Sequence, residues 1–429
     1  MNRVVAFAIV VVGFLTFATA GVQGEPRASA DETARFLAGM PLSEDSPLAK
    51  VVQDATAKQH RAHFDAAFDK FEKTQKTPIR AWVSENLTEH QPVMYYLFGG
   101  PDFLYADAFF PNAKTYVLVG LEPIGQVPDL TKLRPWTVAE SLRNLQGSLR
   151  TILSVSYFIT KQMKEELNTG AVYGTLPILY VFLVRSGKTI HDVNYVYLDE
   201  TGTLQPGDGV RVKSLARGVK IEFTAGTDER KTLYYFTANL SDERPRNAFL
   251  EYCKTFGQGD SLIKSASYML HRSYFAQARS FLLAYSKVLV QDDSGVPIAY
   301  FDPTKWKLQP FGAYLGPLNI FLDENVYQLK LAQLYQKGQP KPLEFGIGYQ
   351  FRAKESNLLL ATKTGEVSET TATIPKEINS RQTEVDNGYA RQQPQVPDRP
   401  RDDRYWDDPF RRPPDGQLPP FPFFLLGPR

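Results

Sequence analysis

The feature that most constrains the fold is a pair of continuous apolar runs, at residues 93–98 and 116–121. Between them stand a glycine turn, Gly99-Gly100-Pro101-Asp102, and a short helical stretch at 103–110. Continuous apolar runs of this length are typical of strands buried on both faces. Alternation of strand, helix and strand favours a parallel sheet covered by helices. We therefore predict an α/β core.

The patterns further along the chain extend this core into a mixed sheet. Four short strand-like runs between residues 193 and 237 alternate with turns rich in Gly and Asp, which predicts an antiparallel edge. We predict an α/β fold whose sheet has a parallel N-terminal part and an antiparallel edge, with helices on its faces. Further buried strands are predicted at 176–184, 288–290, 343–351 and 357–362, and helices at 138–167, 246–256, 261–271, 274–286 and 325–336.

The first twenty residues have the composition of a signal peptide. Asn2 and Arg3 give a charged start, residues 4–17 are apolar apart from one Gly, and Ala18-Thr19-Ala20 supplies a cleavage site. The apolar run is short for a bilayer span, although an uncleaved anchor is the alternative. We predict an exported protein, periplasmic or secreted, with no integral membrane segment after cleavage.

Both flanks of the core differ from it in pattern. Residues 21–77 combine a polar lead-in with an amphipathic helix at 48–74, on which His60 and His63 are expected to face solvent. The core is assigned to residues 78–365. Residues 366–429 are rich in Pro, Arg and Asp, and ten of the chain's 30 prolines fall in the last forty residues. Such a stretch cannot bury enough surface to offset its ordering entropy, so we predict a disordered tail. Its apolar end is a candidate contact with an envelope component, or a tail without a specific partner.

Charge and cysteine content exclude several classes of function. The formal net charge of the 429-residue chain is +2, so no strong field favours nucleic acid, and no nucleic-acid partner is expected. Cys253 is the single cysteine, which rules out an internal disulfide. It lies in a predicted helix, where a buried structural thiol is the better reading than a nucleophile. No metal site is predicted, and the sequence does not identify a cofactor.

The first candidate site joins Asp102 of the glycine turn to Glu122 at the end of the second apolar run. Ligands of open α/β sheets bind at the carboxyl ends of strands, where both residues fall. A nucleotide site is the weaker alternative, because Gly-Gly-Pro-Asp is not G-x-G-x-x-G and Pro101 lacks a backbone donor. The structural alternative for Asp102 is that it caps the following helix.

The second candidate site is the turn Gln291-Asp292-Asp293-Ser294-Gly295. Adjacent carboxylates after a buried strand could bind a cation or hold a water, although calcium requires more oxygens than one turn offers. His271 is a candidate general base if it faces them. The predicted catalytic candidates are Glu122, His271, Asp292 and Asp293, and the predicted ligand-binding residues are Asp102, Glu122 and Ser294.

A third pattern pairs Ser261-x-x-Lys264 with Lys363-Thr364-Gly365. These resemble two of the three motifs of penicillin-binding proteins and serine β-lactamases, in which the Ser is acylated, the Lys activates it and the third motif orients the substrate. The intermediate S-x-N or Y-x-N motif is missing between them, and the separation is short for that fold. The pattern therefore carries little weight.

The whole span from about residue 93 to 361, which is most of the mature chain, resembles exported bacterial proteins of uncharacterised function. In these, a segment like Phe98-Gly99-Gly100-Pro101-Asp102-Phe103 precedes one like Gly120-Leu121-Glu122-Pro123, and one like Ser265-Ala266-Ser267-Tyr268 precedes one like Gln291-Asp292-Asp293-Ser294-Gly295. The resemblance implies no activity. The first expectation is an envelope-associated binding or accessory protein, the second a periplasmic hydrolase with a carboxylate and histidine site, and the third a purely structural protein.

Overall fold

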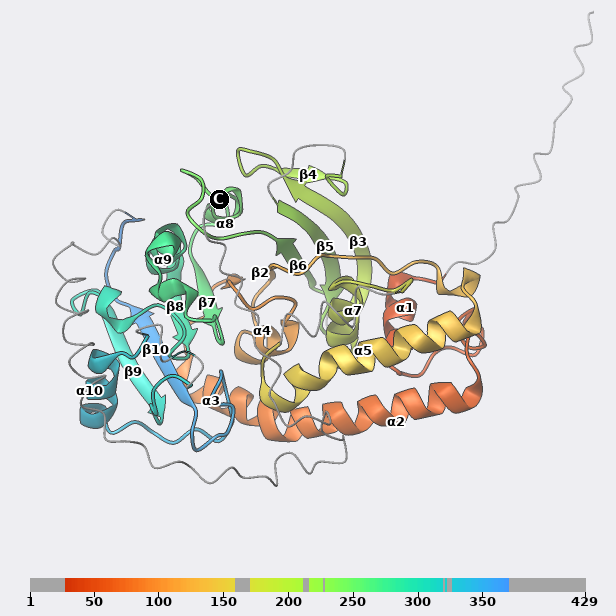
Figure 1. Cartoon of the computed structure of the whole chain (residues 1–429), viewed down its shortest axis with the longest axis horizontal. Coiled ribbons are helices and arrows are strands. Elements are labelled where there is room, and N and C mark those ends of the chain that lie inside the picture. The colour runs from red at the N-terminus through yellow and green to blue at the C-terminus, as the bar shows by residue number, and fades with distance from the viewer. Residues whose placement is uncertain are drawn as a thin grey trace, which may run out of the picture.

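The computed structural model describes residues 28–158, 170–210, 216–226, 228–318, 321 and 326–369. These ranges form a mixed ten-stranded sheet with helices on both faces (Figure 1), which confirms the predicted α/β class. The helices are α1 (Ala30–Leu37), α2 (Asp54–Phe71), α3 (Thr77–Asn86), α4 (Phe103–Phe109), α5 (Pro135–Val155), α7 (Leu176–Arg185), α8 (Ala248–Lys254), α9 (Ala276–Tyr285) and α10 (Leu329–Gly338). The strands are β1 (Val93–Tyr96), β2 (Thr115–Gly120), β3 (Thr189–Leu198), β4 (Leu204–Pro206), β5 (Ala216–Thr224), β6 (Arg230–Thr237), β7 (Gly259–Ile263), β8 (Ser286–Gln291), β9 (Trp306–Gly312) and β10 (Asn357–Lys363).

Parallel strands occupy the centre of the sheet and antiparallel strands flank them on both sides. The order is β4-β3-β5-β6-β2-β1-β7-β8-β10-β9. The run from β6 to β8 is parallel, whereas β5, β3 and β4 on one side and β10 and β9 on the other pair antiparallel. The parallel part is therefore built from both halves of the chain, because β7 and β8 join the predicted β1 and β2.

Two β-α-β units meet at the centre and send their helices to opposite faces. Strand β1 leads through α4 to β2, and β7 leads through α9 to β8, while β1 and β7 lie side by side. The residues of α4 belong to one hydrophobic cluster and those of α9 to the other. The two units thus extend the sheet in opposite directions from the neighbouring parallel strands β1 and β7. Such a position is a topological switch point, where α/β sheets bind ligands.

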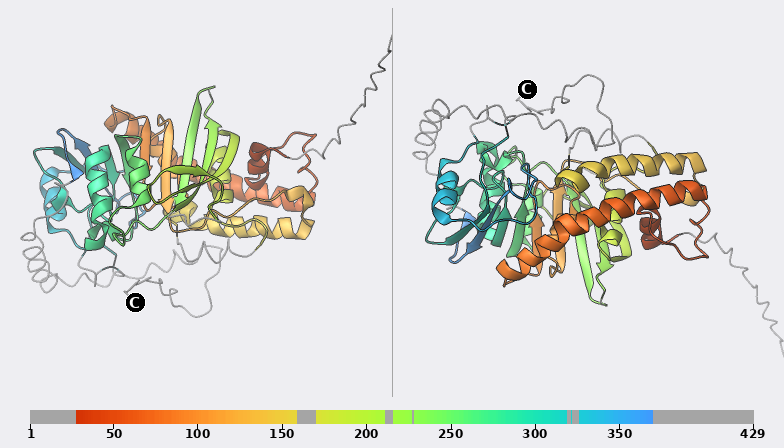
Figure 2. Two further views of the ribbon diagram at one scale, coloured as in Figure 1. Left: turned by 90° about the horizontal axis from the view of Figure 1, so that it is seen from above. Right: turned by 90° about the horizontal axis from the view of Figure 1, so that it is seen from below.

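The face covered by α4 carries the thicker helical layer. Its cluster includes side chains of α1, α2, α3, α5 and α7, and α2 and α5 run side by side along it (Figure 2). The predicted apolar face of α2 is confirmed, but His60 is buried rather than solvent-facing. Its Nε2 lies 2.8 Å from the carbonyl oxygen of Leu37 and its Nδ1 lies 2.8 Å from Nε2 of Gln146, so it joins α2 to α1 and α5.

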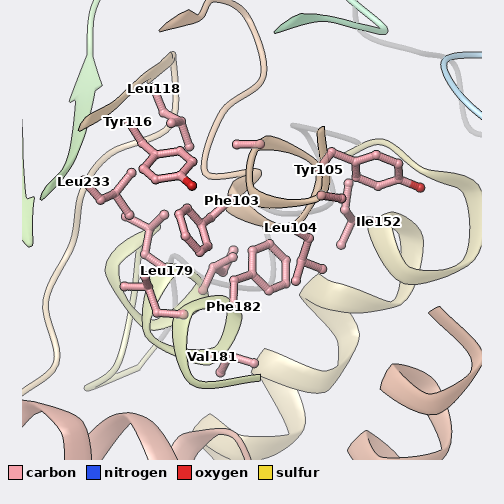
Figure 3. Packing of buried hydrophobic residues seen from close by; sticks show 14 of the residues in the cluster. Phe103, Leu104, Tyr105, Tyr116, Leu118, Ile152, Leu179, Val181, Phe182 and Leu233 are labelled. Carbon is pink, nitrogen blue, oxygen red and sulfur yellow. The ribbon is translucent and has the colours of Figure 1, made fainter. Parts of the chain in front are cut away.

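The apolar run at residues 176–184 forms helix α7 and not the predicted strand. All nine residues are buried, and Leu179, Val181 and Phe182 pack with Phe103 and Leu104 of α4 (Figure 3). Periodicity cannot separate a buried helix from a buried strand when every position is apolar. Packing against α1, α4 and α5 decides in favour of the helix.

The opposite error occurs at residues 261–271, where the prediction is a helix. The segment begins in β7, a central strand buried along its whole length, and continues into an irregular loop. In that loop Ser265, Ser267 and Tyr268 have positive φ, which an α-helix excludes. Four elements, α1, α3, β4 and β9, are not predicted at all, and the predicted strand at 343–351 is irregular.

The predicted signal peptide and the tail from residue 370 onward lie outside the described residues. Helix α1, near the start of the described residues, packs against the rest of the fold. Phe36 and Leu37 are buried in the larger hydrophobic cluster, and Asp31 accepts a hydrogen bond from the backbone amide of Ile190 (2.9 Å). At the other end, Val367 packs on the smaller cluster and Glu369 pairs with Lys254 (2.9 Å). Ordered packing thus reaches beyond the predicted core on both sides.

Candidate functional site

The carboxyl ends of the parallel strands bring together most of the predicted site residues. Asp102 follows β1, Glu122 follows β2, and Asp292 and Asp293 follow β8. Lys264 follows β7 and joins them. These side chains surround the switch point between β1 and β7, the position at which the topology favours a ligand.

Asp102 caps α4 and forms a buried ion pair. One carboxylate oxygen accepts from the amide of Tyr105 (3.2 Å), and the other accepts from the hydroxyl of Tyr96 (2.9 Å) and lies 2.9 Å from Nζ of Lys264. The carboxylate is fully buried. The structural reading of Asp102 as a helix cap is therefore confirmed, and its proposed role toward a ligand stays a prediction.

Lys264 is the functional candidate that sequence reasoning missed in this role. Its side chain is 2% exposed, and Nζ donates to the carbonyl of Ser156 and lies 4.2 Å from the centre of the Tyr105 ring. The signal was present, because a lysine directly after a buried strand must find a counter-charge near that strand end. Asp102 after the neighbouring strand supplies it.

Ser261 and Lys264 do not form the pair that the S-x-x-K pattern requires. The hydroxyl of Ser261 lies 2.7 Å from that of Ser286, whereas Lys264 points to Asp102 and the α4 side of the sheet. Lys363, the first residue of the K-T-G pattern, donates to the carbonyl of Ala284. The resemblance to acylating serine enzymes is therefore wrong at the level of geometry.

Glu122 is buried at the end of β2 with its backbone fixed by β6. The hydroxyls of Tyr235 (2.9 Å) and Thr237 (2.6 Å) donate to its carbonyl oxygen, and Tyr235 also lies 3.5 Å from its Oε2. Glycines make room for the carboxylate, since a Cβ added at Gly120 would meet Oε2 at 2.4 Å. The side chain thus folds back over the glycine turn instead of pointing into solvent.

The carboxylates of the turn after β8 are fixed by hydrogen bonds from the same chain. Asp292 accepts from the backbone amides of Ser265 (2.8 Å) and Ser294 (2.9 Å). Asp293 accepts from the hydroxyl of Tyr268 (2.7 Å) and from the side-chain amide Nδ2 of Asn357 (3.2 Å). Burial raises the pKa of Asp292 above its ordinary value. Burial and the charge of Asp292 raise the pKa of Asp293 to about 7. These two carboxyls therefore bind protons more readily than exposed ones do.

His271 lies beside this turn, as the hydrolase hypothesis requires. Its ring centre is 5.1 Å from that of Tyr268, and the ring is within hydrogen-bonding reach of the backbone of Asp293 and Gly295. Burial lowers the pKa of His271 to about 3, so the ring is neutral at neutral pH. A group with so low a pKa is a weak general base at that pH.

Backbone strain concentrates around the same place. Among the described non-glycine residues with positive φ, Phe98 follows β1, and Ser265, Ser267 and Tyr268 follow β7. A fifth, Ser156, supplies the carbonyl that Lys264 binds. Non-glycine residues adopt such conformations only where the surroundings enforce them, and they cluster at functional sites.

Taken together, the predicted residues form a closed polar cluster in place of an open catalytic pair. We call Asp102, Lys264, Asp292 and Asp293 the acidic cluster. Burial raises the pKa of Tyr96, and the charges of Asp102 and Asp292 raise it further, so its hydroxyl lies between the two sides of the cluster. Within the described ranges, no group of three or more His, Cys, Asp or Glu side chains is placed to hold a metal ion.

Comparison with known proteins finds no matching family model, no matching curated protein and no matching solved structure. The resemblance to uncharacterised exported proteins therefore stays a prediction. No helix in the described part of the chain is long and apolar enough to span a membrane.

Proposed function

We propose that this chain is an exported, envelope-associated binding or accessory protein. The observation that carries the proposal is the state of the candidate carboxylates. Asp102, Glu122, Asp292 and Asp293 are all at most 6% exposed, and each lies within reach of donors from its own chain. Groups held in this way shape the carboxyl edge of the sheet and are poorly placed to attack a substrate.

The alternative of a periplasmic hydrolase draws on one specific observation, the contact between His271 and the Asp293 turn. Three features weigh against it. The histidine pKa of about 3 makes the ring a weak base, Asp293 is engaged by Tyr268 and Asn357, and Asp293 itself is only 4% exposed. We therefore rank binding above hydrolysis.

A partner is expected to contact the carboxyl edge through apolar side chains. Leu121 after β2 is 51% exposed and Tyr274 after β7 is 55% exposed. The carbonyl of Tyr274 accepts from the amide of Asp242, in the loop after β6, and Phe275 packs on Phe98 after β1. Large exposed apolar side chains beside strained loops are typical of contact surfaces.

The test combines export with contact at this edge. A photo-crosslinking amino acid replaces Tyr274 or, separately, Leu121 in the full-length chain expressed in its host. The control position is Trp136 at the start of α5, which is 61% exposed. The expected result is a mature protein that begins at Gly21 in the periplasmic or secreted fraction. Positions 274 and 121 should give the same adduct with an envelope component, and position 136 should give none.

Two results would overturn the proposal. One is a chain that stays in the cytoplasm, or that forms the same adduct from all three positions. The other is a hydrolytic activity of the purified mature chain that Asp292→Asn and Asp293→Asn abolish while the fold, followed by circular dichroism, is retained.

A further inference from the structure

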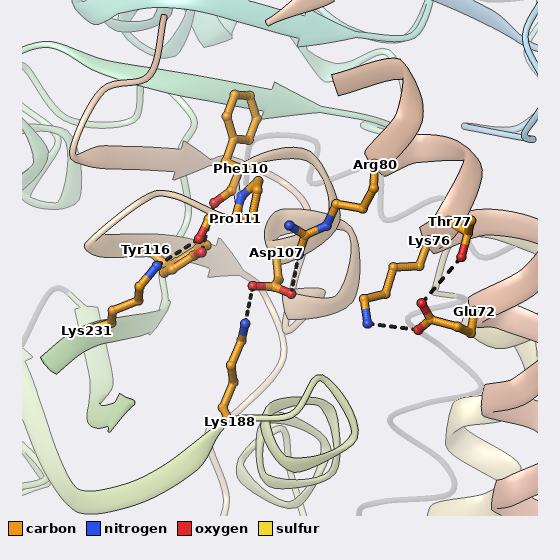
Figure 4. A network of polar contacts seen from close by, with 10 residues as sticks. All are labelled: Glu72, Lys76, Thr77, Arg80, Asp107, Phe110, Pro111, Tyr116, Lys188 and Lys231. Atoms are coloured by element: carbon orange, nitrogen blue, oxygen red, sulfur yellow. Dashed lines mark hydrogen bonds and ion pairs between the residues drawn. The ribbon is translucent and has the colours of Figure 1, made fainter. Parts of the chain in front are cut away.

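A second polar cluster lies at the opposite end of the parallel strands and carries the opposite charge. Arg80 of α3 and Lys188 just before β3 pair with Asp107 of α4 (Figure 4). Lys231 near the start of β6 lies close enough to interact electrostatically with all three. Nζ of Lys188 lies 2.7 Å and Nη2 of Arg80 lies 3.0 Å from the two oxygens of Asp107. We call these four residues the cationic cluster.

The cluster holds more positive charge than its carboxylate can balance. Three cations face one anion, which leaves a formal excess of two positive charges. The neighbouring pairs Lys76–Glu72 and Lys114–Glu229 are each neutral and do not change this sum. Lys188 and Lys231 are only 7% and 8% exposed. An uncompensated charge in such a place is costly, because it has lost most of its hydration.

The donors of the cluster are only partly used. Lys231 donates to the neutral carbonyl of Pro111 (2.8 Å), and an ammonium has three donors. Nε of Arg80 is buried and has no hydrogen-bond partner among the described residues. Burial and the charge of Lys188 lower the pKa of Lys231, whereas Asp107 and Glu229 act in the opposite direction. Each observation indicates that further negative charge would be stabilised here.

The side chain of Arg80 gives the cluster a route to solvent. It is 32% exposed, while the carboxylate that it binds is 1% exposed. An anion that arrives from solvent therefore meets the guanidinium first and has the two buried lysines behind it. Arginine and lysine together are the usual ligands of phosphate oxygens.

We propose that the cationic cluster binds a phosphate group that carries close to two negative charges, either inorganic phosphate or a phosphate monoester. The charge selects this class, since such groups carry about −1.5 to −2 at neutral pH and so balance the excess of two. A phosphodiester of a lipid headgroup carries one negative charge and leaves half of the excess in place. The inference is independent of the contact proposed at the carboxyl edge.

The experiment titrates the mature full chain with inorganic phosphate by isothermal calorimetry at low ionic strength. Lys231→Gln removes one buried cation, and Lys114→Gln is the matched control, since it makes the same charge change at a side chain that is 61% exposed. The expected result is millimolar or tighter binding to the wild type, a loss of about tenfold or more in Lys231→Gln, and a change within about twofold in Lys114→Gln. A wild type that binds no phosphate, or an equal loss in both variants, overturns the proposal.

A second readout covers the case in which Lys231→Gln alters the fold. A ligand that binds only the folded state raises the melting temperature. Phosphate should therefore raise it for the wild type and Lys114→Gln, and should raise it clearly less for Lys231→Gln or Arg80→Gln, whatever the starting value of each. A final arm uses phosphatidylglycerol vesicles. If Lys231→Gln abolishes binding to vesicles and the wild type ignores inorganic phosphate, the site is a membrane contact and the proposal is wrong.

Discussion

The acidic cluster and the cationic cluster are near mirror images in charge, but they reach balance by different means. The acidic cluster has three carboxylates and one ammonium, and the cationic cluster has three cations and one carboxylate. Carboxyls can lower their charge by taking up protons near neutral pH, and the pKa of Asp293 at about 7 reflects this. Arginine cannot lose its proton in that range. Lysine has an ordinary pKa of about 10.4, and although burial lowers the pKa of Lys231, the cluster keeps its excess of positive charge near neutral pH. The acidic cluster can therefore balance its charge by taking up protons, whereas the cationic cluster needs an anion from outside the chain to balance its charge.

The largest effect is expected from Lys264→Met in the acidic cluster. This change leaves Asp102 buried without its counter-charge, so the free energy of unfolding should fall by about 3–5 kcal/mol. The control is Lys254→Met, which removes the ion pairs to Glu251 and Glu369 at a side chain that is 24% exposed. Its loss should be about 1 kcal/mol or less. Urea unfolding followed by circular dichroism measures both, and equal losses would mean that the acidic cluster is not buried as described.

The pH dependence of stability separates the two ways of balancing charge. The pKa of Asp293 is raised to about 7 in the folded chain, from about 3.9 in an unfolded one. The folded state therefore binds this proton more tightly, and its contribution is complete below about pH 4 and lost as the pH rises through about 7. Between pH 4 and 7 the free energy of unfolding of the wild type should therefore fall. That of Asp293→Asn, which lacks this titrating group, should fall by about 2–4 kcal/mol less over the same range.

The measurement is a urea unfolding series at several pH values for both proteins. Asp260, whose pKa burial also raises to about 7, contributes equally to the two and cancels in the difference. Parallel curves for wild type and Asp293→Asn would contradict the account of the acidic cluster.

Removal of the one carboxylate in the cationic cluster should have a smaller but ligand-dependent effect. Asp107→Asn increases the buried excess of positive charge and should lower the free energy of unfolding by about 2–3 kcal/mol. Phosphate at about a hundredfold excess over its dissociation constant should recover about 2.7 kcal/mol of it. Chemical unfolding with and without phosphate checks both numbers. Glu229→Gln, at the exposed Lys114 pair, serves as the control and should change little.

The smallest effect on stability is expected at the proposed contact surface. Tyr274→Ser and Leu121→Ser remove exposed side chains, so the free energy of unfolding should change by about 0.5 kcal/mol or less. The same variants should lose the envelope adduct described above. A large loss of stability in either would mean that these residues serve the fold and not a partner.

Sequence reasoning located the acidic cluster better than the cationic one, for a physical reason. Asp102, Glu122 and Asp292 each stand within a few residues of the end of an apolar run, and parallel strands bring their carboxyl ends to one edge. Lys188 and Lys231 lie at strand starts among exposed residues, where the sequence pattern predicts a solvent-exposed lysine. Their burial arises only when α3 and α4 cover that end of the sheet.

The fold itself was predictable where neighbouring segments fix it. The unit of β1, α4 and β2 follows from two apolar runs and a glycine turn. Helix α7 is predicted as a strand, and strand β7 is predicted as part of a helix. In both cases packing with distant segments decides the structure. Helix α7 is enclosed by helices on the α4 face, and β7 lies between β1 and β8. No local pattern in either segment records that contact.

The most direct test of the contrast between the clusters compares how phosphate changes the unfolding free energy of three proteins. We expect phosphate to stabilise the wild type and Lys264→Met by the same increment, and to stabilise Lys231→Gln by about 1.4 kcal/mol less or not at all. The equal increment would show that the acidic cluster plays no part in binding the anion. An equal increment in all three proteins, or none in any, would contradict the claim that only the cationic cluster requires a charge from outside the chain.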